Sequence, residues 1–311
     1  MAMYVCGSMA YDRIMTFPGT FSESILPDKI DILNVCFLID RLEEKLGGCG
    51  GNIVYSLALL DGQGVVVASV GRDFDRYEAV FKERGLSLEG IAVLEEEFTA
   101  GAYIITDAGN NQITAFNPGA MRHPARYDFP TLGKDDVVMV SPTNAVDMQR
   151  YPRLCRERGV RCIFDPGQQI PALTGEQLLD AITGSYMLIC NDYELELISK
   201  ATGKTTAELC SLAEYVITTL GEKGSRVQHG GRAELVPAVS VEGAVDPTGA
   251  GDAYRGGLLK GLSLHLPVLE SARIGATAAA FCVEHYGTQG QVFTLQEFTE
   301  RHKAFFGEAP F

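Results

Sequence analysis

Short apolar or β-branched runs recur along the chain, each ahead of a segment with helical spacing. The predicted strands are Val65 to Val70, Val137 to Val140, Arg161 to Asp165, Tyr186 to Cys190 and Tyr215 to Thr219. Alternation of such strands with helices is typical of a parallel sheet that is covered by helices on both faces. The pattern therefore predicts a three-layer α/β fold with a central, mostly parallel sheet.

Two other segments differ in pattern and predict a small separate sheet. Residues 102–106 and 112–116 alternate in polarity and flank the turn-forming run 107–111, which predicts a β-hairpin. Residues 12–40 carry Pro18, Gly19 and Pro27 and show little helical periodicity. We expect these parts to form a β-sheet lid, with lid segments at about 12–45 and 98–120 of a single domain that spans 1–311.

The last third of the chain reads as helical, and no repeat or linker divides it from the rest. The predicted helices are Ala250 to Ser263, Val268 to His285 and Thr294 to Phe306. With 311 residues, of which 46% are hydrophobic, the chain can bury one large core.

The charge balance narrows the classes of partner. Forty acidic residues against twenty-six basic residues give a formal net charge of −14. This charge repels the phosphodiester backbone and anionic headgroups, so we expect neither nucleic acid nor a membrane as partner. An anionic substrate would have to be held by backbone amides, a helix N-terminus or a bound cation.

The eight cysteines are scattered singly and form no C-x-x-C pair, and the five histidines show no metal-ligand spacing. This pattern predicts reduced thiols and no structural zinc site. The first residues lack the basic and apolar regions of a signal peptide. We therefore expect a cytoplasmic protein.

The strongest chemical signal is the run DPTGAGD at 246–252, which opens a helical pattern. The small residues Gly249, Ala250 and Gly251 let the backbone turn tightly and expose successive N–H groups to an anion. The dipole of the following helix adds to this attraction and favours an ionised aspartate in its first turn. Asp252 is thus placed as a general base beside an anion-binding turn, although a glycine-rich loop capped by an aspartate would look the same.

This run resembles the signature of the ribokinase-like (PfkB) family of carbohydrate and nucleoside kinases. The resemblance implies a ribokinase-like fold and transfer of the γ-phosphate of ATP to an alcohol group. In the family, the final aspartate takes the proton of the acceptor hydroxyl and the preceding amides form an anion hole. These roles fall on Asp252 and on Gly249, Ala250 and Gly251, and phosphoryl transfer needs little beyond such positioning and charge neutralisation.

A second glycine-rich segment, GGCGGN at 47–52, precedes another helical run. It lacks the G-K-[ST] of a Walker A loop and the third glycine of a dinucleotide fingerprint. It resembles the family's first signature, which implies that Gly48 and Asn52 bind the sugar of the acceptor. Asp12 matches the family's aspartate that binds a vicinal diol. In isolation, Asn52 or Asp12 would fit better as the cap of a helix or turn, and it is their joint order along the chain that favours acceptor binding.

The run NDYE at 191–194 follows a predicted strand and fits two interpretations. Asn191 with Glu194 forms the pattern of a helix capping box, which recurs at 174–177 and 205–208. The same residues match the family's N-x-x-E motif, which implies that Glu194 holds Mg²⁺ through water and that Asn191 lies near the triphosphate. Magnesium keeps most of its waters, so a single carboxylate suffices and both roles can coexist.

The run TLGEKG at 219–224 is a strand end followed by a turn between two glycines. It resembles the family's ATP-binding T-x-G-x-x-G segment, which implies that Thr219, Gly221 and Gly224 lie near the nucleotide. The resemblance also implies that the Ala-rich helix that ends at Val283 and the turn at 286–289 close the adenine side.

Further segments resemble bacterial adenosine and nucleoside kinases within the family. They are GSMAYDRIMTFPGTFSE at 7–23, NNQITAFNPGAM at 110–121, DPGQQ at 165–169 and EHYGTQ at 284–289. This resemblance implies that Phe116, Gln168 and Gln169 approach the acceptor, and that the acceptor group is the 5′-hydroxyl of a nucleoside such as adenosine.

Three alternatives stay open: a broad nucleoside kinase that accepts inosine, guanosine or cytidine, a sugar kinase of the same fold, and a non-catalytic nucleoside-binding relative. A pure binding protein would not need both Asp252 and Glu194. The resemblance implies ATP and Mg²⁺ as ligands. The exact acceptor, a monovalent cation such as K⁺ and a homodimer formed through the lid are not fixed by the sequence.

Overall fold

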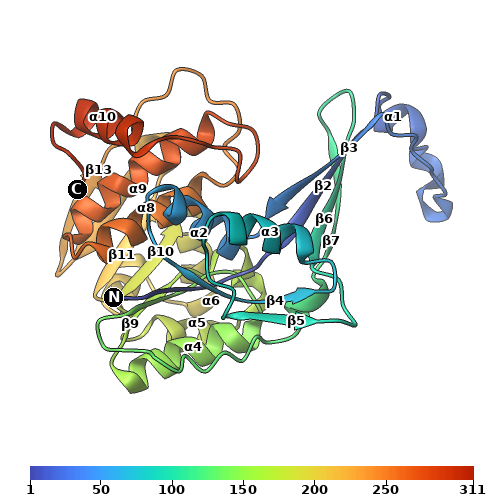
Figure 1. Cartoon of the computed structure of the whole chain (residues 1–311). Coiled ribbons are helices and arrows are strands. Elements are labelled where there is room, and N and C mark those ends of the chain that lie inside the picture. Colours follow the sequence, from blue (N-terminus) through green and yellow to red (C-terminus); the bar gives the residue numbers. More distant parts are fainter.

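Two β-sheets of different size organise the chain, and the structure, a computed structural model, describes all of residues 1–311 (Figure 1). The large sheet has nine strands in the order β13-β12-β11-β10-β9-β8-β1-β4-β5, and the small sheet has four in the order β3-β2-β6-β7. The strands are β1 (Met3–Cys6), β2 (Ala10–Thr16), β3 (Arg41–Gly47), β4 (Val65–Gly71), β5 (Ile91–Leu94), β6 (Ala100–Thr106), β7 (Gln112–Asn117), β8 (Val137–Val140), β9 (Arg161–Phe164), β10 (Met187–Asn191), β11 (Tyr215–Thr219), β12 (Ser225–His229) and β13 (Arg232–Val236).

The helices lie between these strands and dominate the last third of the chain. They are α1 (Phe21–Ser24), α2 (Cys49–Leu59), α3 (Asp75–Glu83), α4 (Ala145–Arg158), α5 (Gly175–Ile182), α6 (Asp192–Thr202), α7 (Thr206–Cys210), α8 (Ala250–Ser263), α9 (Val268–Val283) and α10 (Leu295–Phe306), with 3₁₀ turns η1 (Pro27–Ile32), η2 (Gly119–Arg122), η3 (Gly167–Ala172) and η4 (Gly221–Lys223). No helix combines the length and the apolar character that crossing a membrane requires.

The large sheet is parallel from β11 through to β5, and β12 and β13 extend it as an antiparallel edge. The central strand β8 is fully buried, as its run of valine and methionine predicts for a strand covered on both faces. One hydrophobic core joins the sheet to α2, α3, α8 and α9, and a second joins it to α4, α5, α6 and α7. The predicted α/β architecture with a mostly parallel sheet is confirmed.

The small sheet, β3-β2-β6-β7, projects from one end of the molecule and is called the lid below (Figure 1). Its outer pairs β2–β3 and β6–β7 are antiparallel, whereas the central pair β2–β6 is parallel. Between β2 and β3, residues 17–40 join no sheet and instead extend beyond the lid with α1 and η1. Pro18 and Gly19 follow the end of β2, and Pro27 opens η1, which accounts for the break in the strand.

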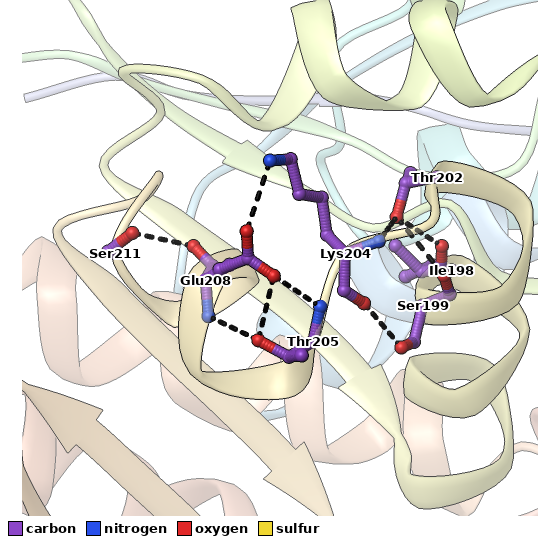
Figure 2. Close-up of polar contacts among 7 residues, drawn as sticks. All are labelled: Ile198, Ser199, Thr202, Lys204, Thr205, Glu208 and Ser211. Carbon is purple, nitrogen blue, oxygen red and sulfur yellow. Dashed lines mark hydrogen bonds and ion pairs between the residues drawn. The ribbon is translucent and has the colours of Figure 1, made fainter.

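Capping boxes fix several helix starts, and the three predicted at 174–177, 191–194 and 205–208 all form. Figure 2 shows the last of them. Thr205 Oγ1 accepts the N–H of Glu208 at 3.2 Å, and Glu208 Oε2 accepts the N–H of Thr205 at 2.8 Å. Lys204 Nζ adds an ion pair to Glu208 Oε1 at 3.1 Å. These contacts hold the turn between α6 and α7.

Candidate active site

A cavity of about 750 Å³ lies between the lid and the carboxyl ends of the parallel strands. Ligand sites of open α/β sheets lie at this edge, because the loops there lead into helix N-termini. Most of the site residues predicted from the sequence line it: Asp12, Gly48, Asn52, Phe116, Gln168, Gln169, Asn191, Glu194, Thr219, Gly221, Gly249, Gly251 and Asp252. Residues from both ends of the chain thus meet at one site.

A second cavity of about 470 Å³ adjoins the first and holds the two remaining predicted residues, Gly224 and Ala250. Thr219, Gly221 and Gly251 line both cavities. The rest of the second cavity is mainly apolar, with side chains from the β13–α8 loop and from α8 and α9. An apolar slot beside a polar chamber suits a ligand with a flat base at one end and charged groups at the other.

The first turn of α8 stands where the two cavities meet. Gly249 precedes the helix with φ +85°, a left-handed conformation that side chains rarely adopt, and a Cβ there would lie 3.0 Å from the Thr288 backbone. The tight turn leaves the first N–H groups of α8 without intrahelical partners. The N–H of Ala250 donates to the carbonyl of Pro247 at 3.2 Å, and the neighbouring N–H groups can bind an anion. Asp252 lies in this first turn.

Asp252 is partly buried and has one side-chain partner. Asn52 Nδ2 on α2 donates a hydrogen bond to Asp252 Oδ2 at 2.8 Å. Burial raises the pKa of Asp252 to about 6, while the nearby Arg255 and the hydrogen bond from Asn52 lower it. A carboxylate with this pKa is ionised at neutral pH and is still basic enough to take a proton from a hydroxyl.

Arg255 connects the first turn of α8 to Asp165, which follows strand β9 of the large sheet. This residue was not predicted from the sequence. Its Nε and Nη2 donate to Asp165 at 2.7 and 2.5 Å, and its Nη1 donates to the carbonyl of Gly251 at 2.9 Å. Ser141 Oγ donates to Asp165 as well, at 2.8 Å. Arg255 and Asp165 are only 7% and 2% exposed, so the bidentate geometry is what compensates for their burial. A cation inside the otherwise small and apolar run 253–259 is a signal that sequence analysis could have used.

Acidic residues outnumber basic residues on the wall of the large cavity. Arg255 is the single lysine or arginine that lines the cavity, whereas five acidic residues line it: Asp12, Asp165, Asp192, Glu194 and Asp252. A polyphosphate bound in this cavity would therefore need the backbone amides at α8 and a cation brought with it.

The lid supplies the opposite wall. Asp12, Ala102 and Phe116 lie side by side in the register of β2, β6 and β7, and Asp12 and Phe116 line the cavity. Burial raises the pKa of Asp12. Gly48, with φ +88°, brings the start of α2 so close to the first strands that a Cβ would lie 2.6 Å from the Ser8 carbonyl. This arrangement leaves room for a polar ligand between lid and sheet.

Cys49 is a further wall residue that the sequence did not indicate. Gln168 Nε2 contacts its sulfur at 3.5 Å, and burial raises the pKa of the Cys49 thiol. The thiol therefore stays neutral and acts as a small apolar surface beside Gln168.

Glu194 serves a capping box and faces the cavity at the same time. Its Oε2 accepts the N–H of Asn191 at 2.8 Å, and Asn191 Oδ1 accepts the N–H of Glu194 at 2.7 Å. Burial raises the pKa of Glu194. The structure contains no group of three His, Cys, Asp or Glu side chains that could hold a metal by itself. A divalent cation fits here if one carboxylate oxygen, Glu194 Oε1, is joined by water and ligand oxygens, as Mg²⁺ prefers.

The turn at 286–289 lies on the lid side of the site, where Thr288 lines the large cavity, whereas the Ala-rich helix α9 lines the apolar cavity. Tyr286 packs under Lys45 of β3, whose Nζ lies 3.4 Å from the ring centre. Thr288 lines the large cavity and donates through Oγ1 to the carbonyl of Leu46 at 3.0 Å. Thr288 and Gln289 in this turn therefore form hydrogen bonds to β3 and α2. The local sequence does not predict these contacts.

Comparison with known proteins is consistent with this site. Residues 24–294 match the model of the pfkB family of carbohydrate kinases. A nucleoside kinase of Burkholderia thailandensis, solved in complex with inosine, is 37% identical, with 99% of each chain covered and a TM-score of 0.86. Its complex with ADP and inosine gives 38% identity, 99% and 97% coverage and a TM-score of 0.85. A nucleoside kinase of Methanocaldococcus jannaschii is 29% identical over 270 residues, which cover 86% of this chain and 89% of that protein.

Proposed function

The chain belongs to the pfkB family of carbohydrate kinases, and from this premise we propose that it transfers the γ-phosphate of ATP to the 5′-hydroxyl of a nucleoside, with adenosine among its acceptors. It is an ATP-dependent phosphotransferase that acts on an alcohol group, with a ribokinase-like fold. The observation that carries the proposal is the position of Asp252 in the first turn of α8, where the polar and apolar cavities meet.

Phosphoryl transfer at this site proceeds in three coupled events. Asp252 accepts the proton of the acceptor hydroxyl, the hydroxyl oxygen bonds to the γ-phosphorus, and the bond from that phosphorus to the leaving oxygen of ADP breaks. The N–H groups of Gly249, Ala250 and Gly251 stabilise the charge on the transferred group. Thr219, Gly221, Gly224 and Asn191 hold the nucleotide, whose base enters the apolar cavity.

Glu194 is the residue that would hold Mg²⁺ at this site, through its free carboxylate oxygen. When bound, Mg²⁺ would neutralise phosphate charge in a cavity that is rich in carboxylates. The supporting feature is that only one oxygen of Glu194 is used by the capping box.

The acceptor is assigned to the lid side. Asp12, Gly48 and Asn52 surround the position of a ribose, with a carboxylate that can accept from a vicinal diol. Phe116 offers a ring on which a base can stack, and Gln168 and Gln169 can donate to or accept from a base edge. Because Ala102 stands in register between Asp12 and Phe116 and adds no ring, the base pocket is loose. Inosine, guanosine and cytidine are therefore candidate competitors, and the inosine complexes of the Burkholderia relative favour this broader specificity.

An ATP-dependent screen tests the proposed acceptor class. ADP release is measured with adenosine, inosine, guanosine, cytidine, ribose and fructose, and kcat/KM is compared. We expect every purine nucleoside to exceed both free sugars. A sugar with the highest kcat/KM would overturn the nucleoside assignment and leave the kinase assignment intact, whereas no acceptor-dependent ADP release would favour a binding protein.

The lid is also our candidate for a homodimer contact. Residues 26–38, which extend beyond it, expose the side chains of Leu26, Ile30, Ile32 and Leu38, and β7 exposes Ile113 and Phe116. Apolar side chains grouped in this way are typical of an interface. Light scattering that gives the mass of one chain would contradict the dimer.

All eight cysteines are free thiols, which supports a cytoplasmic location.

A further inference from the structure

Gln289, in the loop between α9 and α10, connects two residues that the sequence places far apart. Its Nε2 donates to Asn52 Oδ1 at 3.0 Å and to the hydroxyl of Tyr77 at 2.6 Å. Its Oε1 is buried and has no hydrogen-bond partner. Both hydrogen bonds of the Gln289 side chain are thus made by its N–H groups. The two acceptors, Asn52 Oδ1 and the Tyr77 hydroxyl, hold the amide in one orientation.

The orientation follows from the chemistry of the neighbours. The hydroxyl of Tyr77 donates its single proton to the carbonyl of Gly47 at 2.9 Å, since a carbonyl can only accept. The oxygen of Tyr77 can therefore only accept from Gln289, and Nε2 is the only atom of that amide that can donate. Nε2 then also faces Asn52, so Asn52 must present Oδ1 to Gln289.

The consequence reaches Asp252. With Oδ1 of Asn52 directed to Gln289, Nδ2 is directed to Asp252 Oδ2, where it donates at 2.8 Å. An ionised carboxylate can only accept, so this is the orientation that suits the ionised base. The loop is fixed before Gln289 by Thr288, which donates to the carbonyl of Leu46 at 3.0 Å, and after it by Gln291, which donates to Ser56 Oγ at 3.1 Å.

We propose that Gln289 is a positioning residue that fixes the polarity of the Asn52 amide, so that Asn52 donates to Asp252 while Asp252 acts as the base. This role rests on the proposed function of Asp252. Gln289 does not line the large cavity, so it acts on the acceptor only through Asn52. In the chain of hydrogen bonds Tyr77–Gln289–Asn52–Asp252, Gln289 Nε2 donates to both of its neighbours and Asn52 Nδ2 donates on to Asp252. Turning either amide over would place two like groups together.

Two substitutions of similar size separate polarity from packing. Gln289→Met removes the donor, and Asn52 can still turn Nδ2 toward Asp252. Gln289→Glu keeps the shape but supplies an acceptor, so Asn52 is drawn to turn Nδ2 toward the new carboxylate and Oδ1 toward Asp252. We expect kcat to fall roughly 3–10-fold in Gln289→Met and roughly 30–300-fold in Gln289→Glu, with KM for ATP changed less than about threefold in both. A packing role predicts the opposite order, since Glu is the closer shape.

A double-mutant cycle with Asn52→Ala tests whether the effect passes through Asn52. In the Asn52→Ala background, Gln289→Glu should be no worse than Gln289→Met, because there is no amide left to reverse. If Gln289→Glu keeps its additional loss there, the new charge acts directly on the site and the proposal is wrong. Equal kcat in the two single variants would also overturn it.

Tyr77→Phe provides a second route if Gln289→Glu does not fold, as judged by its thermal unfolding. Loss of the hydroxyl frees Gln289 to rotate, so kcat should fall roughly 3–10-fold at unchanged KM for ATP. Unchanged kcat would contradict the proposal. If Asp252→Asn retains normal turnover, the proposed function fails instead, and the two failures are distinguishable.

Discussion

At the scale of single residues, the proposed role of Asp252 as the base predicts that the rate depends on pH in a defined direction. Burial raises its pKa to about 6, and it must be ionised to accept a proton. We predict that kcat/KM for adenosine increases with pH up to about 6 and is level above it, because the base is protonated below that pKa. The profile between about pH 5 and 8 at saturating Mg²⁺ checks this. A value of kcat/KM that is constant across that range would contradict the role of Asp252 as the base.

Glu194 and Glu208 offer a matched pair of capping glutamates, of which only Glu194 lines the cavity. Glutamine also serves in a capping box, so Glu194→Gln should keep helix α6 in place. We predict that Glu194→Gln raises the Mg²⁺ concentration for half-maximal rate about tenfold, and that Glu208→Gln leaves it unchanged. Identical Mg²⁺ titrations of the two variants would show that Glu194 caps helix α6 and does not bind Mg²⁺.

Individual site residues were predictable when a motif carried them. Asp252, Gly249 and Asn191 stand in short runs whose local chemistry already suggests an anion-binding turn or a cap. Asp165 opens the run DPGQQ, yet its partner Arg255 is 90 positions away, and nothing local pairs them. The same holds for Gln289, whose contacts depend on how the last loop packs against α2 and α3.

At the scale of elements, the capping box at α7 can be tested without disturbing the site. Thr205 Oγ1 accepts the N–H of Glu208 (Figure 2). The neighbouring Thr206 is exposed like Thr205 but does not occupy the cap position. We predict that Thr205→Ala lowers the free energy of unfolding by about 1 kcal/mol and leaves kcat unchanged. Denaturant unfolding provides the measurement, and Thr206→Ala is the control. Equal stability of the two variants would mean that this cap contributes nothing.

The elements that the sequence predicted well are those with a clear local period. The buried strands β8 and β11 and the helix α8 have the predicted bounds. The lid was only partly predictable, since β2 and β6 pair in parallel although β3, β4 and β5 lie between them in the chain. Long-range pairing of this kind leaves no periodic trace in either strand.

At the scale of the whole molecule, we expect the lid to separate a bound acceptor from solvent. It carries Asp12 and Phe116, so an acceptor bound to these residues also ties the lid to the large sheet. We predict that hydrolysis of ATP without acceptor is at least about 100-fold slower than phosphorylation of adenosine, because water reaches the γ-phosphate only while the lid is open. Phosphate release with and without adenosine measures the ratio. Comparable rates would show that the lid does not control the chemistry.

We propose that Asp252 is the base of a nucleoside-phosphorylating site, and the Asp252→Asn variant is the sharpest test of this role. The substitution keeps the shape and removes the proton acceptor. We predict that kcat with adenosine falls roughly 10²–10⁴-fold while the calorimetric Kd for adenosine changes less than about threefold. A variant that binds adenosine and turns over at nearly the normal rate would contradict it.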